Sequence, residues 1–72
     1  SGRIKNADYV VNTILNQIIS IFSNTIYNKV VVYAHKMIIS RMDKITILDK
    51  KIDYKIIDTT RLDYFNIEKY IK

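Results

Sequence analysis

The fold depends on residues 7–42, which read ADYVVNTILNQIISIFSNTIYNKVVVYAHKMIISRM. Apolar residues recur here at spacings of three and four, apart from one adjacent pair at the end, which is the period of an amphipathic helix. Polar side chains fall largely on the other side. The segment therefore predicts one long helix with a broad apolar stripe. The stripe consists of Val11, Leu15, Ile18, Phe22, Ile26, Val30, Tyr33, Met37 and Ile38.

Three poor helix formers, Ser23, Asn24 and Thr25, interrupt this segment. They could divide it into a helical hairpin. Because the apolar stripe keeps its phase across them, we favour one continuous helix.

Residues 43–72 contain two helix-start signals. Thr46–Asp49 and Thr60–Asp63 both fit the capping box, in which the Thr hydroxyl and the acid three residues later satisfy backbone N–H groups. Each heads an apolar pattern, which predicts two short helices, after a loop at 43–45 and a break at 58–59. The chain has no Pro and only one Gly, which disfavours tight β-turns. The expected fold is all-α, a long central helix followed by two short helices.

The competing interpretation of the same residues is a β-hairpin with strands at 44–48 and 52–57. Alternating Ile residues permit it, although the turn lacks Gly and Asn. The alternative fold class is then α+β, a helical hairpin packed on a small β-hairpin.

The order long helix, loop, short helix resembles the second half of the histone fold. Residues 44–49, KITILD, resemble the second loop of archaeal and core histones. Residues 57–70 resemble the extra C-terminal helix of histone-fold subunits in general transcription factors. The resemblance departs at the first histone helix, which residues 1–6 cannot supply, so either that helix is lost or residues 8–22 form it and 26–41 form a shortened second one.

This resemblance implies function by pairing, because histone folds are handshake dimers whose long helices cross. It also implies DNA contacts at the paired loops, here near Arg41 and Lys44.

The chain has 72 residues, which predicts a single small domain over 1–72, with 1–6 as a flexible tail. A chain this short buries only about 60% of its unfolded surface and usually needs a disulfide, a metal or a partner. It has no Cys and a single His, His35, which excludes disulfides, thiolate sites and histidine-rich metal clusters. A partner chain is the expected support, and no cofactor or metal is predicted.

We expect this partner, a second copy or another protein, to cover the apolar face of the long helix. Residues 9–28 carry no charge, as is typical of a buried contact surface. Several Asn residues interrupt this stretch and no cleavage site follows it, so we predict neither a membrane span nor a signal peptide. The predicted interface consists of Leu15, Ile18, Ile19, Phe22, Ile26, Val30, Tyr33 and Met37.

The net charge of +5 is consistent with a nucleic-acid partner, and equally with a lysine-rich codon bias. Four basic residues surround the first predicted short helix and form the predicted nucleic-acid contact. Such binding would be electrostatic and largely independent of sequence. The six tyrosines are spread along the chain, and we interpret their rings as lying at the rim of a core or interface. The predicted contact consists of Arg41, Lys44, Lys50 and Lys51.

No residue pattern predicts catalysis. His35 is interpreted as a boundary or interface residue, and Asp49 and Asp53 as a helix cap and a solvated acid. Gly2 stands alone and cannot form a phosphate-binding loop. The sequence therefore predicts a non-enzymatic interaction subunit that dimerises through its long helix. The alternative is a small basic protein that binds the phosphate backbone of DNA or RNA.

Overall fold

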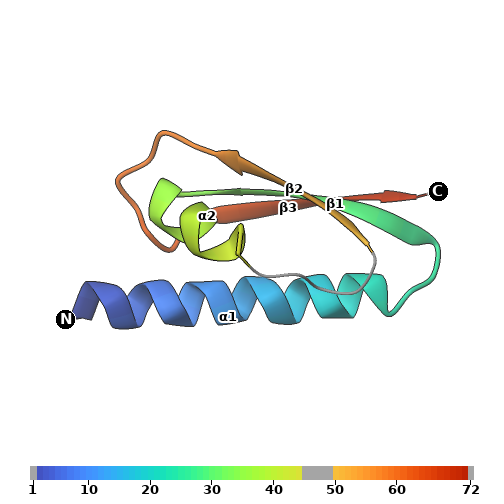
Figure 1. Ribbon diagram of the computed structural model, residues 1–72, viewed down its shortest axis with the longest axis horizontal. Helices are drawn as coiled ribbons and strands as arrows, with labels where there is room; N and C mark the ends of the chain where they lie inside the picture. Colours follow the sequence, from blue (N-terminus) through green and yellow to red (C-terminus); the bar gives the residue numbers. More distant parts are fainter. Residues whose placement is uncertain (1, 45–49, 72) are drawn as a thin grey trace.

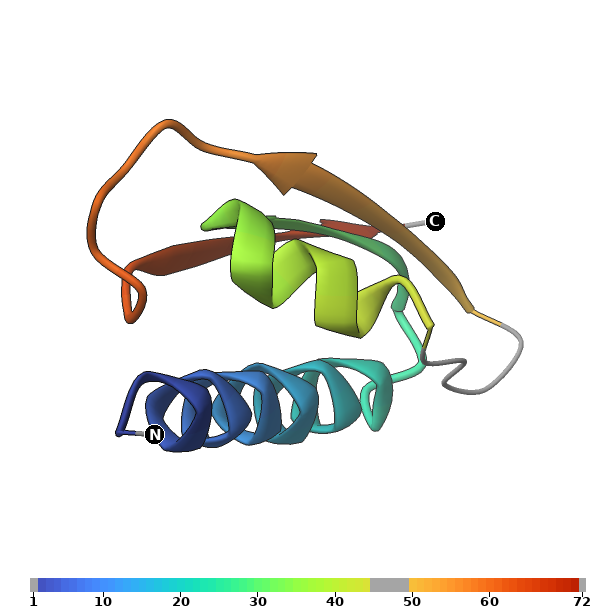
Figure 2. The ribbon, with the colours of Figure 1, turned by 60° about the vertical axis from the view of Figure 1, so that its left-hand side comes forward.

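The computed structural model describes residues 2–44 and 50–71 as a two-layer α+β unit (Figures 1 and 2). A long helix, α1 (Gly2–Phe22), leads into strand β1 (Tyr27–Ala34) and a short helix, α2 (Lys36–Met42). Strands β2 (Lys51–Ile56) and β3 (Phe65–Ile71) complete a three-stranded sheet. Both helices lie on the same face of this sheet (Figure 2). The residues expected to be a tail form, from Gly2 on, the first turns of α1.

The predicted continuous helix is wrong, because α1 ends at Phe22 and residues 27–34 form a strand. The side chains at the break satisfy backbone groups locally: the Ser23 hydroxyl donates to the Ser20 carbonyl at 2.6 Å, and Asn24 Oδ1 accepts from the Ile26 N–H at 3.1 Å. Such local bonds compete with the helix. The β-branched run that follows then favours a strand. The all-α class and the histone-like fold are therefore wrong as well.

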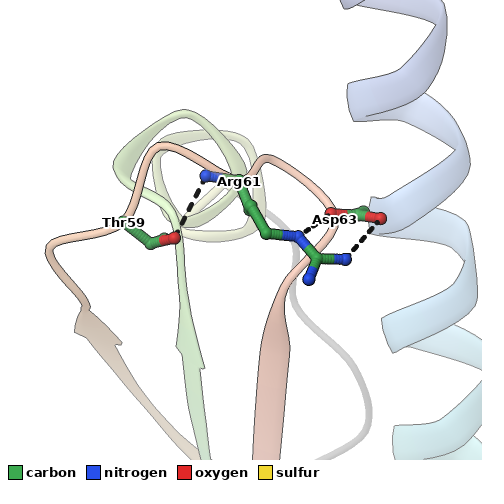
Figure 3. A network of polar contacts seen from close by, with 3 residues as sticks. All are labelled: Thr59, Arg61 and Asp63. Atoms are coloured by element: carbon green, nitrogen blue, oxygen red, sulfur yellow. Dashed lines mark hydrogen bonds and ion pairs between the residues drawn. The ribbon is translucent and has the colours of Figure 1, made fainter.

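The short helices predicted after residue 43 are not found in the described part of the chain. The first capping box, 46–49, lies outside the described residues, and the residues after it form β2. The second box does not start a helix. Instead, the Thr59 hydroxyl accepts from the Arg61 N–H at 3.0 Å, and the Arg61 guanidinium donates to both Asp63 oxygens at 3.3 Å (Figure 3). Asp63 thus bonds to the Arg61 side chain within an irregular connection, and the residues after it form β3.

The sheet order is β2-β1-β3, with β1 parallel to β2 and antiparallel to β3. Parallel neighbours need a crossover connection, and α2 supplies it. The alternative α+β reading named the right class, but its helical hairpin is absent from the described residues. Strand β2 pairs with β1, and residues 45–48 of the other strand of the expected β-hairpin lie outside the described residues. Residues 57–64 must pass around the end of β1 to reach its other side, and Leu62, 7% exposed, anchors this connection in the core.

The core lies between the two helices and the helix side of the sheet. The buried residues of α1 follow the spacing of threes and fours that the sequence showed, and those of β1 on this side alternate. The stripe therefore identified the buried side of α1 but continued wrongly into β1. The core residues are Ala7, Val10, Val11, Ile14, Ile18, Phe22, Val30, Val32, Ala34, Ile38, Ile39, Met42 and Leu62.

Two adjacent isoleucines of α1 test this assignment, since Ile18 is fully buried and Ile19 is 53% exposed. We expect Ile18→Ala to lower the free energy of unfolding by about 2–5 kcal/mol, through lost burial and a residual cavity. We expect Ile19→Ala to change it by less than about 0.5 kcal/mol. Urea denaturation at two protein concentrations measures both. Equal costs with a concentration-dependent midpoint would instead place both residues at an interface between chains.

Candidate functional site

The side of the sheet that faces away from the helices carries nine side chains in three rows. They alternate along the strands with the core residues Val30, Val32 and Ala34, so they point the other way. We call this surface the open face, because both helices lie on the opposite side (Figure 1). Its rows, each from β2 through β1 to β3, are Lys51, Lys29 and Tyr70; Asp53, Val31 and Glu68; and Lys55, Tyr33 and Asn66.

Lys29 holds the centre of the first row. Its ammonium nitrogen lies 3.3 Å from Asp53 Oδ2 and 5.2 Å from the centre of the Tyr70 ring. The two charged side chains are 34% and 39% exposed, so the ion pair contributes at most about 1 kcal/mol. The contacts therefore orient the lysine more than they stabilise the fold.

Glu68 joins two tyrosines from different strands. The hydroxyls of Tyr33 and Tyr70 both donate to its Oε1, at 2.7 and 3.1 Å. The bond from Tyr33 is the main cause that lowers the pKa of Glu68, with help from Tyr70 and from the charge of Lys55. The same bonds raise the pKa of Tyr33 and of Tyr70. Glu68 is thus held ionised, and it fixes both phenol groups.

The open face has a small positive excess. Three lysines face two carboxylates, which leaves one net positive charge. Both carboxylates have partners on the face, whereas Lys51 and Lys55 lie beyond ion-pair distance of every carboxylate in the described residues. Val31, at the centre, is only 4% exposed beneath these longer side chains. Two accessible ammonium groups and two aromatic rings therefore share one uncovered surface.

The four basic residues predicted to contact nucleic acid do not share a surface. Arg41 lies on α2, where its Nη1 is 3.5 Å from Asp8 Oδ1 of α1. Lys44 follows α2, and the Lys50 ammonium lies 5.9 Å from the centre of the Phe22 ring, on the helix side. Only Lys51 belongs to the open face.

The eight residues of the predicted dimer interface are also separated. Ile18, Phe22 and Val30 are buried inside the unit, and Leu15 and Met37 pack against the same core. Tyr33 lies on the open face. Ile19 and Ile26 remain exposed, at 53% and 46%. Dimerisation through the apolar face of α1 would need residues that the sheet already covers. Dimerisation itself stays a prediction.

The residues weighed for catalysis have other contacts. His35 precedes α2, and its Nδ1 accepts from the Met37 N–H at 3.0 Å. Asp53 pairs with Lys29, and Asp49 lies outside the described residues. Across residues 2–44 and 50–71, no three His, Asp or Glu side chains come together in a way that could hold a metal ion. Within the same ranges, no helix has the length and apolar character needed to span a membrane.

Sequence reasoning missed the open face. The signals were the alternations of Lys29, Val31 and Tyr33 in β1 and of Glu68 and Tyr70 in β3. Each becomes visible only when its segment is read as a strand.

Compared with known proteins, the chain matches no family model, no curated protein and no solved structure.

The hydrogen bonds to Glu68 can be tested by alkaline titration. Because a carboxylate acceptor favours the protonated phenol, the pKa values of Tyr33 and Tyr70 lie above the ordinary 10.0. We expect Glu68→Gln to bring both down toward that value, as followed by NMR of the tyrosine ring carbons. Tyr54 is the internal control, since burial is the main cause that raises its pKa. Unchanged titration of Tyr33 and Tyr70 in the variant would contradict the network.

The effect of Glu68 protonation on folding stability can be tested in acid. The lowered pKa of Glu68 means that its contribution to stability is present above the ordinary carboxyl value of 4.5 and is lost as pH falls through the lowered pKa. The stability difference between the protein and Glu68→Gln should therefore shrink in that range.

Proposed function

We propose that the open face binds single-stranded nucleic acid, through the phosphate backbone and through stacking of bases on tyrosine rings. The observation that carries this proposal is the convergence of three lysines and two tyrosines from three strands on a sheet face that neither α1 nor α2 covers. Proteins that bind single strands without sequence preference combine a basic surface with aromatic side chains. The net charge of +5 favours approach of a polyanion.

The electrostatics of the face suit a weak, sequence-independent contact. Asp53 is paired with Lys29, which limits its repulsion of a phosphate. Glu68 keeps its charge, and the two remaining lysines of the face, Lys51 and Lys55, outweigh it. Lys51 and Lys55 lie two rows apart on the edge strand β2, about 13 Å along it. Their ammonium groups are therefore placed to meet separate phosphates of an extended strand.

The aromatic groups add a surface for bases. Tyr70 is 44% exposed, and the nearby Lys29 ammonium supplies a cation where a phosphate would follow a stacked base. Three strands span about 10 Å between their outer axes, which exceeds the minor-groove width of duplex DNA, about 6 Å. The face is therefore too wide for a minor groove, and its tyrosine rings suit a single strand, whose base faces are free to stack.

The lysines of β2 test the proposal against the surface predicted from sequence. We expect the double variant Lys51→Gln/Lys55→Gln to weaken binding of a fluorescent single-stranded oligonucleotide. The slope of log affinity against log salt should fall by about 1.4, because each phosphate contact contributes about 0.7. Fluorescence anisotropy across a salt series measures both quantities.

The matched control is Lys44→Gln/Lys50→Gln, which removes the same charge from the sequence-predicted region. A larger loss in the control than in the β2 variant would place the contact outside the open face. Absence of binding by the unmodified protein at low salt would eliminate the function.

Stacking is tested separately by Tyr70→Leu. We expect about a fivefold or greater loss of affinity with no change in salt slope, because a stacked base contributes about 1–3 kcal/mol without neutralising a phosphate. Tyr64→Leu is the control, since Tyr64 is 46% exposed, much like Tyr70, but lies in the β2–β3 connection. Equal effects of the two variants would argue against a specific stacking position.

A further inference from the structure

Strand β3 has one edge that no strand covers within residues 2–44 and 50–71. It pairs with β1 on one side only, so the alternate N–H and C=O groups of its other side point outward. Natural edge strands are commonly protected by Pro, by bulges, by shortness or by charge. The opposite edge strand, β2, has charges at three of its six positions, whereas β3 has seven residues, no Pro and two charges.

A groove runs beside this edge, between β3 and α1. Its lining from α1 is Gln17, Ser20 and Ile21, and its lining from β3 is Phe65, Asn66, Ile67 and Lys69. A strand added to β3 would lie about 4.8 Å from it, and every second side chain would point to the helix side of the sheet. Those side chains would enter the groove, where Ile21, Phe65 and Ile67 favour apolar residues.

Lys69 is the one charged side chain among the described residues that line the groove. Its ammonium lies 4.9 Å from the centre of the Tyr27 ring, which holds it in place. A residue directly opposite Lys69 on an added strand would be within reach of this charge. On the other side of the sheet, Glu68 would face a residue of opposite sign.

From these features we propose that the outer edge of β3 binds an extended segment of another protein by antiparallel strand addition. The segment carries apolar residues that enter the groove and an acidic residue opposite Lys69. Main-chain hydrogen bonds supply affinity and the groove selects the alternate side chains, as in other strand-addition complexes. This site shares Glu68 and Asn66 with the open face but uses the outer edge of β3 and the groove, and it does not rest on nucleic-acid binding.

The probe is the capped heptapeptide Val-Thr-Glu-Lys-Val-Thr-Ile. Paired antiparallel with residues 65–71, it places its Glu opposite Lys69, its Lys opposite Glu68, and its second Val and its Ile opposite Ile67 and Phe65. We expect it to slow hydrogen exchange of the alternate β3 amides that do not bond to β1. Amide NMR shifts should also concentrate on β3 and on Gln17 and Ile21.

A charge swap tests the register. We expect Lys69→Glu, or the peptide with Lys in place of its Glu, to weaken binding about fivefold each, and the two changes together to restore it. Lys36→Glu is the matched control, because it makes the same charge change on α2 and should leave the effect of the peptide substitution intact.

Four outcomes would overturn the proposal. The peptide could fail to slow exchange at β3, or it could produce its shifts elsewhere. The charge swap could fail to restore binding. The β3 amides could also be protected without peptide in a protein of doubled mass by light scattering, which would show that a second copy occupies the edge.

Discussion

Strand β1 pairs with another strand along both edges and is covered by the helices on one side, and these contacts determine most of the architecture. Its helix-side residues Val30, Val32 and Ala34 are fully buried, and they provide the surface on which the apolar stripe of α1 packs. Its parallel pairing with β2 requires a crossover, which brings α2 beside α1. Its antiparallel pairing with β3 leaves β2 and β3 as the edges of the sheet formed by residues 2–44 and 50–71. Both surfaces for which a function is proposed, the open face and the β3 edge, follow from this central position.

The open face shows how polar contacts can orient side chains without contributing much stability. The pair between Lys29 and Asp53 is partly exposed, and such pairs contribute little to folding free energy. The contacts of Asp53 and Glu68 act through geometry, because they limit where the Lys29 ammonium and the phenol groups of Tyr33 and Tyr70 can lie. The lysines of β2 have no such constraint from a carboxylate in the described residues, so they remain available to an external anion.

The helical character of residues 7–22 could be predicted, because the spacing of threes and fours does mark the buried side, but neither end of α1 was predicted. The prediction failed beyond residue 22 because Ile26, Val30 and Tyr33 continue that spacing although two of them lie in a strand. In β3, the alternation of Phe65, Ile67 and Ile71 with polar residues is the period of a strand, but the capping box before it suggested a helix. The open face could not be predicted, because Tyr33 and Glu68 are 35 positions apart and meet only through strand register.

The path of residues 57–64 around the end of β1 has a consequence for folding. Strands β1 and β2 pair residues that are 22 positions apart, through the α2 crossover. Once they have paired, only residues 57–64 separate β2 from β3, so β3 has a short loop to close. Until β3 arrives, the valine-rich centre of the sheet is itself a bare edge strand. In any state in which β3 is detached, this apolar strand is open to pairing with that of another molecule. The burial of Leu62 opposes such detachment, since it holds the connection on the core at the point from which β3 begins.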